Sequence, residues 1–496
     1  MDLLYRSTRG GESNVTASQA ILKGLASDGG LFVPDQIPAL DVSIDDLAKM
    51  TYQETAYAVM KQFLTDFTEE ELKYCIENAY DDKFDTEEIA PLAKAGGAYF
   101  LELFHGKTIA FKDMALSILP YFMTTAARKN NAKNEIVILT ATSGDTGKAA
   151  MAGFADVPGT RIIVFYPKDG VSRVQELQML TQKGKNTCVV GIDGNFDDAQ
   201  TGVKKIFGDK EFAKELDEMG FQLSSANSIN IGRLVPQIVY YVYAYAKLYA
   251  NGEIKKGEKV NVTVPTGNFG NILAAYLAKQ MGIPFDKLIC ASNDNKVLYD
   301  FFTTGEYDKN RDFILTSSPS MDILVSSNLE RLLYLSCGRD AEKTKAMMND
   351  LSMKGKYEIT ADMKEFMADF CAGYAGMNEN AETIKKLYED TGYLIDTHTG
   401  VAAAVYNTYK VKTGDTKKTI IASTASPYKF SKSVVEAVCG KDWIEADEFK
   451  LIDKLEKLSG VKIPQAIEEI RTAKILHNMQ CKPQEMKETV KSSFSK

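Results

Sequence analysis

A repeated order of strand, polar turn and helix constrains the fold of this chain more than any other feature of its sequence. Residues 135–142 are nearly all apolar and rich in β-branched side chains, which is typical of a strand buried on both faces of a sheet. A polar turn and a helix of small residues follow, and the same order recurs at residues 259–281. Helical segments separate these strands from further predicted strands at residues 161–166, 187–192, 287–292 and 418–424. Strands that alternate with helices form parallel sheets covered by helices, so the sequence predicts an α/β fold.

The length of the chain accommodates several domains. Its 496 residues allow two or three domains at about 150 residues each. Helix-capping signatures ahead of helical runs predict a mainly helical N-terminal domain at residues 1–90. Two α/β domains are expected at residues 91–240 and 241–440, with helices dominating residues 296–411. A charged helical extension is expected at residues 441–496.

Composition argues against several classes of function. The net charge of −8 disfavours broad nucleic-acid binding, which needs basic patches that neutralise phosphates. No apolar run reaches the ~20 residues that cross a bilayer, and the first residues contain no apolar signal segment. We therefore expect no membrane partner and a cytoplasmic location. The seven cysteines are scattered without a paired motif and the three histidines lack metal-ligand spacing, so no metal site is expected.

One lysine stands out by its position after an apolar stretch. Lys112 lies beside Phe111 and Asp113, and the residues before it predict a buried strand. Burial lowers the pKa of a lysine because desolvation disfavours the ammonium form. A neutral lysine amine can form a Schiff base with an aldehyde, and pyridoxal phosphate is the aldehyde cofactor that uses lysine in this way. On this fragment alone a surface lysine at a helix start is the stronger interpretation, so the cofactor hypothesis depends on the rest of the chain.

Two polar turns connect a buried strand to a helix, at residues 142–147 and 266–271. Ligands of open α/β sheets bind beyond the carboxyl ends of the strands, and a helix N-terminus offers free N–H groups to an anion. Each turn is therefore a candidate phosphate cradle. The alternative is that the glycines only allow a tight connection between strand and helix.

Two further polar segments are candidates for binding. Three neutral hydrogen-bonding side chains and an arginine lie between Asn227 and Arg233, and arginine binds phosphate or carboxylate in a bidentate manner. The alternative is a polar loop that leads to a helix opened by Pro236. In residues 423–426 a hydroxyl could bond a cofactor ring nitrogen, or it could be a helix N-cap. His398 is interpreted as a helix-start residue.

Taken together, these segments resemble threonine synthase, a family of fold-type-II pyridoxal-phosphate enzymes. The likeness covers most of the chain, and its motifs follow the family's order and approximate spacing. They are Tyr-Arg-Ser-Thr-Arg-Gly (5–10), Gly-Leu-Ala-Ser-Asp-Gly-Gly-Leu-Phe-Val-Pro (24–34), the lysine segment (103–113), Thr-Ala-Thr-Ser-Gly-Asp-Thr-Gly (140–147), Ser-Ala-Asn-Ser-Ile-Asn (225–230), Gly-Asn-Phe-Gly-Asn (267–271) and Thr424.

The resemblance implies a fold and a reaction. The fold is α/β, with two open parallel-sheet α/β domains and the cofactor between them, as in the tryptophan synthase β-like fold, plus the mainly helical N-terminal domain. The reaction converts O-phospho-L-homoserine and water into L-threonine and phosphate with pyridoxal 5'-phosphate as cofactor.

The resemblance also implies roles for individual residues. Lys112 is the Schiff-base lysine and then the base that moves protons at the substrate's α and β carbons. The cofactor-binding residues are Lys112, Asp145, Gly267, Asn268, Phe269, Gly270, Asn271 and Thr424. The substrate-binding residues are Thr142, Ser143, Thr146, Asn227, Ser228 and Arg233.

The chain departs from the family's pattern at three positions. Lys107 stands where the family often has proline, Ser426 where it has histidine, and Asp145 where many fold-type-II enzymes have asparagine near the cofactor ring. Two alternatives stay open: a phospho-lyase or dehydratase of the same fold that releases a 2-oxo acid and ammonia, and a non-catalytic paralogue that binds the cofactor. The sequence leaves open a monomer or a homodimer.

Overall fold

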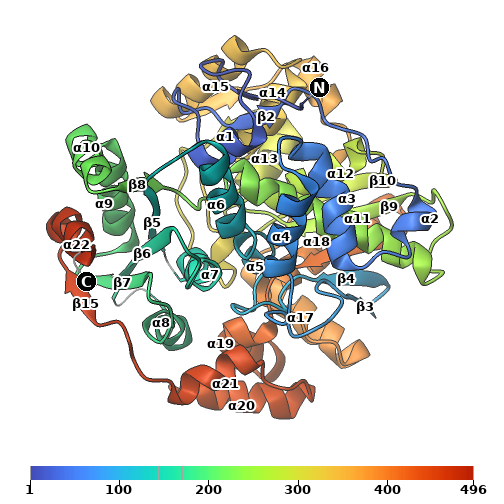
Figure 1. The fold of residues 1–496 in the computed structure, drawn as a ribbon. Helices are drawn as coiled ribbons and strands as arrows, with labels where there is room; N and C mark the ends of the chain where they lie inside the picture. The colour runs from blue at the N-terminus through green and yellow to red at the C-terminus, as the bar shows by residue number, and fades with distance from the viewer. Residues whose placement is uncertain (1, 143, 169–170, 495–496) are drawn as a thin grey trace.

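The computed structural model describes residues 2–142, 144–168 and 171–494, and two sheets organise most of them (Figure 1). One sheet has six strands in the order β13-β10-β9-β14-β4-β3, and the other has five in the order β15-β7-β6-β5-β8. Every neighbouring pair in these two sheets is parallel except β3 with β4, which are antiparallel. The predicted α/β class is confirmed.

The six-stranded sheet is the centre of the larger half of the molecule. Its strands are β3 (Leu92–Ala95), β4 (Ala98–Glu102), β9 (Val260–Pro265), β10 (Phe285–Ser292), β13 (Phe370–Tyr374) and β14 (Thr419–Ser423). All six residues of β9 are buried, as expected for a central parallel strand covered on both faces. The helices of this half are α11 (Ile231–Ala250), α12 (Gly270–Gln280), α13 (Val297–Thr304), α14 (Leu329–Ser336), α15 (Ala341–Met353), α16 (Ala361–Phe366), α17 (Met377–Thr391) and α18 (Thr397–Thr413). A hairpin of β11 (Glu306–Asp308) and β12 (Lys356–Glu358) and a short 3₁₀ turn, η1 (Pro319–Met321), complete it.

The five-stranded sheet forms the smaller half, on the left in Figure 1. Its strands are β5 (Glu135–Ala141), β6 (Thr160–Pro167), β7 (Thr187–Ile192), β8 (Phe221–Ser224) and β15 (Met479–Cys481). The intervening helices are α5 (Lys112–Leu116), α6 (Leu119–Lys129), α7 (Asp145–Phe154), α8 (Arg173–Leu180), α9 (Phe196–Gly208) and α10 (Lys210–Glu218). The predicted strands at residues 135–142, 161–166 and 187–192 therefore exist within one or two residues of their expected ends.

The N-terminal segment packs on the larger half through helices. It contains β1 (Tyr5–Ser7), β2 (Phe32–Pro34), α1 (Ala17–Lys23), α2 (Ile44–Leu47), α3 (Tyr52–Phe63) and α4 (Glu69–Ala79). Thr68 and Glu71 form the reciprocal capping box that the sequence predicts at the start of α4. One hydrophobic cluster joins α1, α3 and α4 to α11 and α12, so the N-terminal helices share a core with the larger sheet.

The C-terminal segment crosses from one half of the molecule to the other. After the turn η2 (Pro427–Phe430), it contains α19 (Ser431–Cys439), η3 (Lys441–Trp443), α20 (Glu448–Ser459), α21 (Gln465–Thr472), β15, η4 (Pro483–Glu485) and α22 (Met486–Ser493). Figure 1 shows the chain leaving α21 below the larger half and reaching β15 beside β7.

Several expectations from the sequence differ from this structure. Strand β4 lies in the six-stranded sheet with β9 and β14, so sheet membership does not follow the expected segments 91–240 and 241–440. Helices dominate residues 296–411 as expected, but that region also contains the sheet strand β13, and the expected helical extension at 441–496 contains β15. These strands are short, and they are recognisable only from their pairing with β10 and β7.

Proline 236 does not open its helix. α11 begins at Ile231 with Asn230 as its N-cap, and Pro236 lies inside the helix. Residues 231–235, which the polar-loop alternative placed before the helix, are therefore helical. Almost the whole of α11 is buried, so tertiary packing outweighs the helix-breaking tendency of proline.

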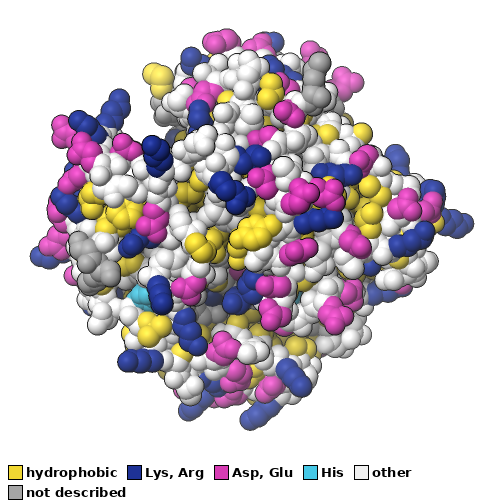
Figure 2. Space-filling model, viewed as in Figure 1, with side chains coloured by type: hydrophobic (Ala, Val, Ile, Leu, Met, Phe, Trp, Pro, Cys, Tyr) yellow, Lys and Arg dark blue, Asp and Glu magenta, His cyan; other side chains and the backbone are white. Residues whose placement is uncertain are grey.

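The surface is that of an ordinary charged protein. Figure 2 shows side chains of Lys, Arg, Asp and Glu intermixed over the visible face, with hydrophobic side chains in separate spots. None of the described helices is both long enough and apolar enough to span a bilayer. Across residues 2–142, 144–168 and 171–494, no group of three His, Cys, Asp or Glu side chains is arranged to hold a metal ion.

Candidate active site

The Lys112 side chain lies at the carboxyl ends of strands β4 and β14. The chain that leads to it runs along the end of β14, where the Phe111 N–H donates to the Thr424 carbonyl oxygen at 2.8 Å. This contact brings two predicted cofactor residues, Lys112 and Thr424, together from distant parts of the sequence. The Lys112 side chain is only 13% exposed, and burial lowers the pKa of its amine to about 8, against the opposing charge of Asp145.

Asp145, the first residue of α7, is the carboxylate nearest this amine. Its Oδ2 lies 3.6 Å from the Lys112 Nζ, and its Oδ1 lies 3.0 Å from the Lys429 Nζ. Gln175 donates to the same carboxylate at 3.0 Å. Burial acts to raise the pKa of Asp145, but the charges of Lys429 and Lys112 outweigh it and hold that pKa well below its usual range. Asp145 is therefore an ionised carboxylate between two buried lysines.

Asp113, which is adjacent to Lys112 in the sequence, is directed elsewhere. Its carboxylate accepts the Thr108 N–H at 2.7 Å and the Thr108 hydroxyl at 2.6 Å. Burial raises its pKa. The residue closes the turn before α5 and leaves Asp145 as the acidic neighbour of the lysine.

The turn between β9 and α12 has the features of an anion site. Its residue Phe269 adopts a left-handed conformation with φ of +67°, and no side chain in the described part of the chain caps the helix that begins at Gly270. The Phe269 ring packs against Phe302 and Phe370, with centroid separations of 6.0 and 5.7 Å, which stabilises this unusual turn. The first N–H groups of α12 are consequently without a side-chain acceptor, and they lie at the positive end of the helix dipole.

The residues around this turn leave little space for larger side chains. A Cβ atom on Gly267 would lie 2.5 Å from the Ser320 carbonyl oxygen. The Asn271 Oδ1 accepts hydrogen bonds from the hydroxyls of Tyr240 and Tyr241, both at 2.6 Å. The Asn271 Nδ2 is buried and has no partner among the described residues. A buried donor without an acceptor points to a ligand at this place.

Arg233 is a buried cation near the same region. Its guanidinium donates to the Ala226 carbonyl oxygen at 2.9 Å, whereas its Nε has no partner among the described residues. Desolvation lowers its pKa to about 10. Asn328 joins the two predicted loops, because its Nδ2 donates to the carbonyl oxygens of Ser228 at 3.3 Å and Asn268 at 3.1 Å.

The remaining predicted substrate residues have varied surroundings. The Thr142 hydroxyl oxygen accepts the N–H groups of Gly144 at 3.0 Å and Gly147 at 3.1 Å, so it shapes the turn into α7. Thr146 is half-buried in the first turn of α7, and Asn227 is exposed, with the Ser228 hydroxyl donating to it at 3.3 Å. Ser143 lies outside the described residues. A substrate contact at these positions stays a prediction.

The sequence did not identify two groups that the structure places at this site, Lys429 and Ser320. His398 lies in the first turn of α18, as the sequence predicted, and its Nε2 accepts the Ser320 N–H at 3.1 Å. The Lys429 side chain is 1% exposed, although its sequence context, between Tyr428 and Phe430, is that of an ordinary loop. Ser320 is separated from Lys112 by 208 residues, and the Lys112 amine donates to its hydroxyl at 3.3 Å. No local pattern signals such a contact.

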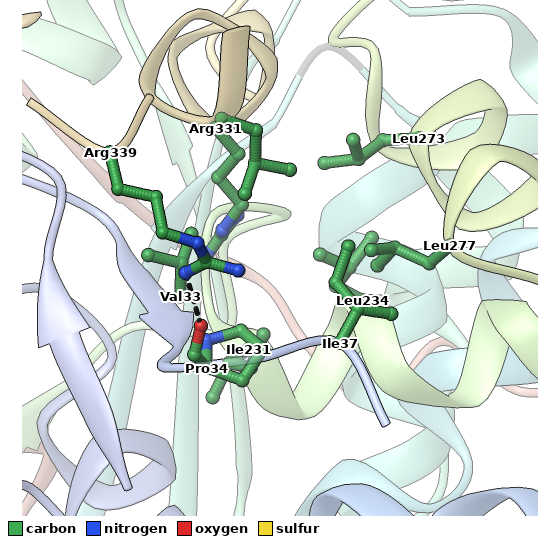
Figure 3. Close-up of a pocket in the computed structure, with 10 residues that line it drawn as sticks. Val33, Pro34, Ile37, Ile231, Leu234, Leu273, Leu277, Arg331 and Arg339 are labelled. Atoms are coloured by element: carbon green, nitrogen blue, oxygen red, sulfur yellow. Dashed lines mark hydrogen bonds between the residues drawn. The ribbon is translucent and has the colours of Figure 1, made fainter. Parts of the chain in front are cut away.

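A separate crevice in the larger half does not belong to this site. Figure 3 shows it between the chain around β2 and the helices α11, α12 and α14, lined mainly by apolar side chains and two arginines. Arg339 donates to the Pro34 carbonyl oxygen at 2.8 Å, and Arg331 donates to the Phe32 carbonyl oxygen at 3.0 Å. Both guanidinium groups therefore attach the N-terminal segment to the larger half.

Comparison with known protein families places the chain in a class of enzymes that is consistent with the fold and with these buried groups. Residues 86–357 match the family described as "Pyridoxal-phosphate dependent enzyme", and the chain belongs to this class of enzymes. Residues 4–80 match the family described as "Threonine synthase N terminus".

Individual relatives narrow the class. The chain is 36% identical over 490 residues to threonine synthase of Saccharomyces cerevisiae, which covers 92% of this chain and 94% of that protein. The crystal structure of pyridoxal-phosphate-bound threonine synthase from Brucella melitensis superposes with a TM-score of 0.88 at 34% identity, covering 99% of each chain. Threonine synthase-like 1 of Macaca fascicularis is 40% identical over 447 residues, or 88% of this chain, and the chain spans 59% of that relative's length. The chain is therefore a member of the threonine synthase family.

The described residues fit the cofactor of this family. A buried amine with a lowered pKa suits bonding to an aldehyde, and an uncapped helix N-terminus suits a phosphate. The unpartnered Asn271 Nδ2 adds a hydrogen-bond donor in the same turn.

Proposed function

We propose that this chain is a threonine synthase, a carbon–oxygen lyase that acts on a phosphorylated substrate. It converts O-phospho-L-homoserine and water into L-threonine and phosphate. The observation that carries the proposal is a buried lysine amine with a pKa lowered to about 8, in a site that also contains an uncapped helix and a buried, partly unpaired arginine. An amine, a phosphate cradle and a second anion site are what a cofactor phosphate and a substrate phosphate together require.

The cofactor-binding residues follow from the same arrangement. Lys112 would bond pyridoxal phosphate through its amine, and the α12 N-terminus with residues 267–271 would hold the cofactor phosphate. Thr424, at the end of β14, offers a neutral hydroxyl to the cofactor ring. The bound cofactor supplies an electron sink that acidifies the protons on the α and β carbons of the substrate.

The protein's own groups then act on the substrate. The Lys112 amine takes protons from the α and β carbons of the substrate, the phosphate leaves from the γ carbon with its bonding electrons, and protons returned by the amine accompany the addition of water at the β carbon. A pKa of about 8 lets the amine both accept and donate protons near neutral pH. Asp145 remains charged beside Lys429 and keeps a negative group close to the lysine. Arg233 grips the substrate phosphate, the leaving group, with donors that no buried carboxylate occupies among the described residues.

Product analysis tests this function. The purified protein is mixed with pyridoxal phosphate and O-phospho-L-homoserine, the products are identified by NMR, and phosphate release is assayed. We expect L-threonine with one phosphate per turnover. Phosphate together with 2-oxobutyrate and ammonia would establish the phospho-lyase instead, and cofactor binding without any phosphate release would keep the cofactor assignment and overturn the substrate.

A control variant separates the lysine's role from folding. Lys112→Ala is expected to keep its circular dichroism spectrum and to lose turnover. Normal turnover in this variant would remove Lys112 from the reaction.

A further inference from the structure

A short strap of chain, residues 316–322, crosses the site between β11 and α14. It is fixed on one side by the Thr397 hydroxyl, which donates to the Ser317 carbonyl oxygen at 2.6 Å. On the other side the Asn293 Nδ2 donates to the Ser318 hydroxyl at 3.1 Å. Within the strap, Asp322 accepts the Thr316 N–H at 3.0 Å. The strap is thus a held part of the site rather than a loose loop.

The Ser320 hydroxyl connects the two charged groups of the site. It accepts a hydrogen bond from the Lys112 Nζ at 3.3 Å and donates one to the Asp145 Oδ2 at 3.1 Å. The direct distance between Lys112 and Asp145 is longer, at 3.6 Å. A hydroxyl has one proton and two lone pairs, so a proton directed to Asp145 leaves a lone pair directed to the amine.

The backbone of Ser320 is held by a histidine. Its N–H donates to the His398 Nε2 at 3.1 Å, and the His398 Nδ1 lies 2.8 Å from the Asp396 Oδ2. Because Nε2 accepts, the ring proton lies on Nδ1 and is donated to Asp396. Asp396 is fully buried and also accepts the Thr399 N–H at 3.0 Å as the N-cap of α18. This relay fixes both the tautomer and the orientation of the imidazole.

We propose that Ser320 is a catalytic residue: its hydroxyl orients the Lys112 amine for proton transfer while the amine is not bonded to the cofactor. His398, held by Asp396, positions Ser320 for this role. The inference rests on the proposed function, since Lys112 must alternate between bonding the cofactor and moving protons. A misplacement of about 1 Å in such a group costs about 100-fold in rate. The role of the hydroxyl is therefore orientation of the reacting nitrogen, with Asp145 fixing the direction of the hydroxyl proton.

Four variants test the proposal on the full-length protein. Ser320→Ala is expected to lower kcat about 10- to 100-fold with little change in KM, because the amine loses its acceptor while the substrate groups are untouched. Ser317→Ala, in the same strap but away from Lys112, is the matched control and should keep kcat. His398→Leu should lower kcat as Ser320→Ala does. His398→Gln should retain most of it, because the glutamine oxygen can accept the Ser320 N–H.

Two readouts separate a positional role from a structural one. The first is amide hydrogen exchange of residues 316–322, which should stay protected in Ser320→Ala and His398→Gln and lose protection in His398→Leu. The second is the rate at which cofactor-free protein captures pyridoxal phosphate at Lys112, trapped by borohydride and located by mass spectrometry. We expect slower capture in Ser320→Ala and in His398→Leu.

The outcomes are decisive in both directions. If Ser320→Ala keeps kcat and the capture rate within twofold, or loses them only together with strap protection, the proposal is wrong. If the unaltered protein forms no threonine, the proposed function fails, but hydrogen exchange and cofactor capture still decide whether Ser320 and His398 act on Lys112.

Discussion

The amine of Lys112 should titrate well below an ordinary lysine. Burial lowers its pKa to about 8, whereas an exposed lysine has a pKa of about 10.4. Only the deprotonated amine attacks an aldehyde, so capture of pyridoxal phosphate by the cofactor-free protein should rise with pH and reach half its maximum at about pH 8. Stopped-flow absorbance measures the rate of capture at a series of pH values from about 6 to about 10, a range that includes the lowered pKa of Lys112. A midpoint near that of free lysine would contradict the burial of the amine.

The pairing of Asp145 with Lys429 should be visible in stability. Removing one partner of a buried pair costs about 3–5 kcal/mol when the remaining charge has no other partner, and Lys112, 3.6 Å from Asp145, should make the loss smaller than that here. We therefore expect Lys429→Met to unfold at a lower urea concentration than the unaltered protein, and the double variant with Asp145→Asn to recover part of that loss. Because the pKa of Asp145 is held below its usual range, the contribution of the pair is present near neutral pH and is lost as the pH falls through that lowered pKa.

An exposed pair supplies the control for this measurement. Lys417 lies 3.1 Å from Asp286, but its side chain is 41% exposed. Such pairs contribute about 0–1 kcal/mol, so Lys417→Met should change the unfolding midpoint little. Equal losses of stability in Lys429→Met and Lys417→Met would show that the buried pair of Lys429 and Asp145 stabilises the protein no more than an exposed pair does.

At the scale of elements, the packing of α5 against α7 sets the distance between Lys112 and Asp145. Each of these residues is the first of its helix, so a shift of one helix moves one group relative to the other. Gly153 of α7 is where the backbones approach, since a Cβ there would lie 2.1 Å from the Leu116 carbonyl oxygen. The close approach therefore fixes the site as well as the core.

Gly153→Ala should separate the two helices. Overpacking of this kind costs about 1–3 kcal/mol, so we expect lower stability in urea and slower cofactor capture. Gly208→Ala, at the end of α9 with open space around its Cβ position, is the matched control. It should be neutral or slightly stabilising, because alanine restricts the unfolded chain. Unchanged stability and capture in Gly153→Ala would mean that the helices can move apart freely.

At the scale of the whole molecule, the C-terminal segment links the two sheets. It packs α20 and α21 near α8 and α19, then adds β15 to the edge of the five-stranded sheet and lays α22 on α9. The apolar contacts of α22 include Met486 and Val490, both buried in the cluster that covers β5, β6 and β7. The smaller half therefore depends on residues from the far end of the chain.

Truncating one of these contacts should weaken the smaller half. Met486→Ala removes a side chain that is 1% exposed, and such substitutions cost about 2–5 kcal/mol. Met353→Ala removes one that is 86% exposed and should leave the unfolding midpoint nearly unchanged. Calorimetry of both variants measures the difference. Equal midpoints would show that α22 does not contribute to the stability of the sheet.

The central strands and the two polar turns were predictable because their patterns are local. Strand β9 has the sequence Val-Asn-Val-Thr-Val-Pro, whose β-branched residues favour a strand. The tight turn before α12 is marked by its closely spaced glycines, Gly267 and Gly270. The edge strands β13 and β15 were missed because short edge strands carry no such pattern and exist through their pairing. The position of Pro236 was misjudged because burial of α11 outweighs the local preference of proline.

The sequence by itself determined the α/β class, the lysine, the glycine-rich turn and the likeness to threonine synthases. Each of these depends on residues that are neighbours in the chain. The tertiary structure decided that Asp145, rather than the adjacent Asp113, lies beside the Lys112 amine, and that Ser320 contacts that amine. It also decided that Lys429 pairs with Asp145 and that His398 holds the backbone of Ser320. The physical reason is that a buried charge needs a charged or hydrogen-bonding partner, and at the ends of the strands the available partners come from segments far apart in the sequence. The order of the strands in the sheets decides which segments meet there, and that order is set by long-range pairing.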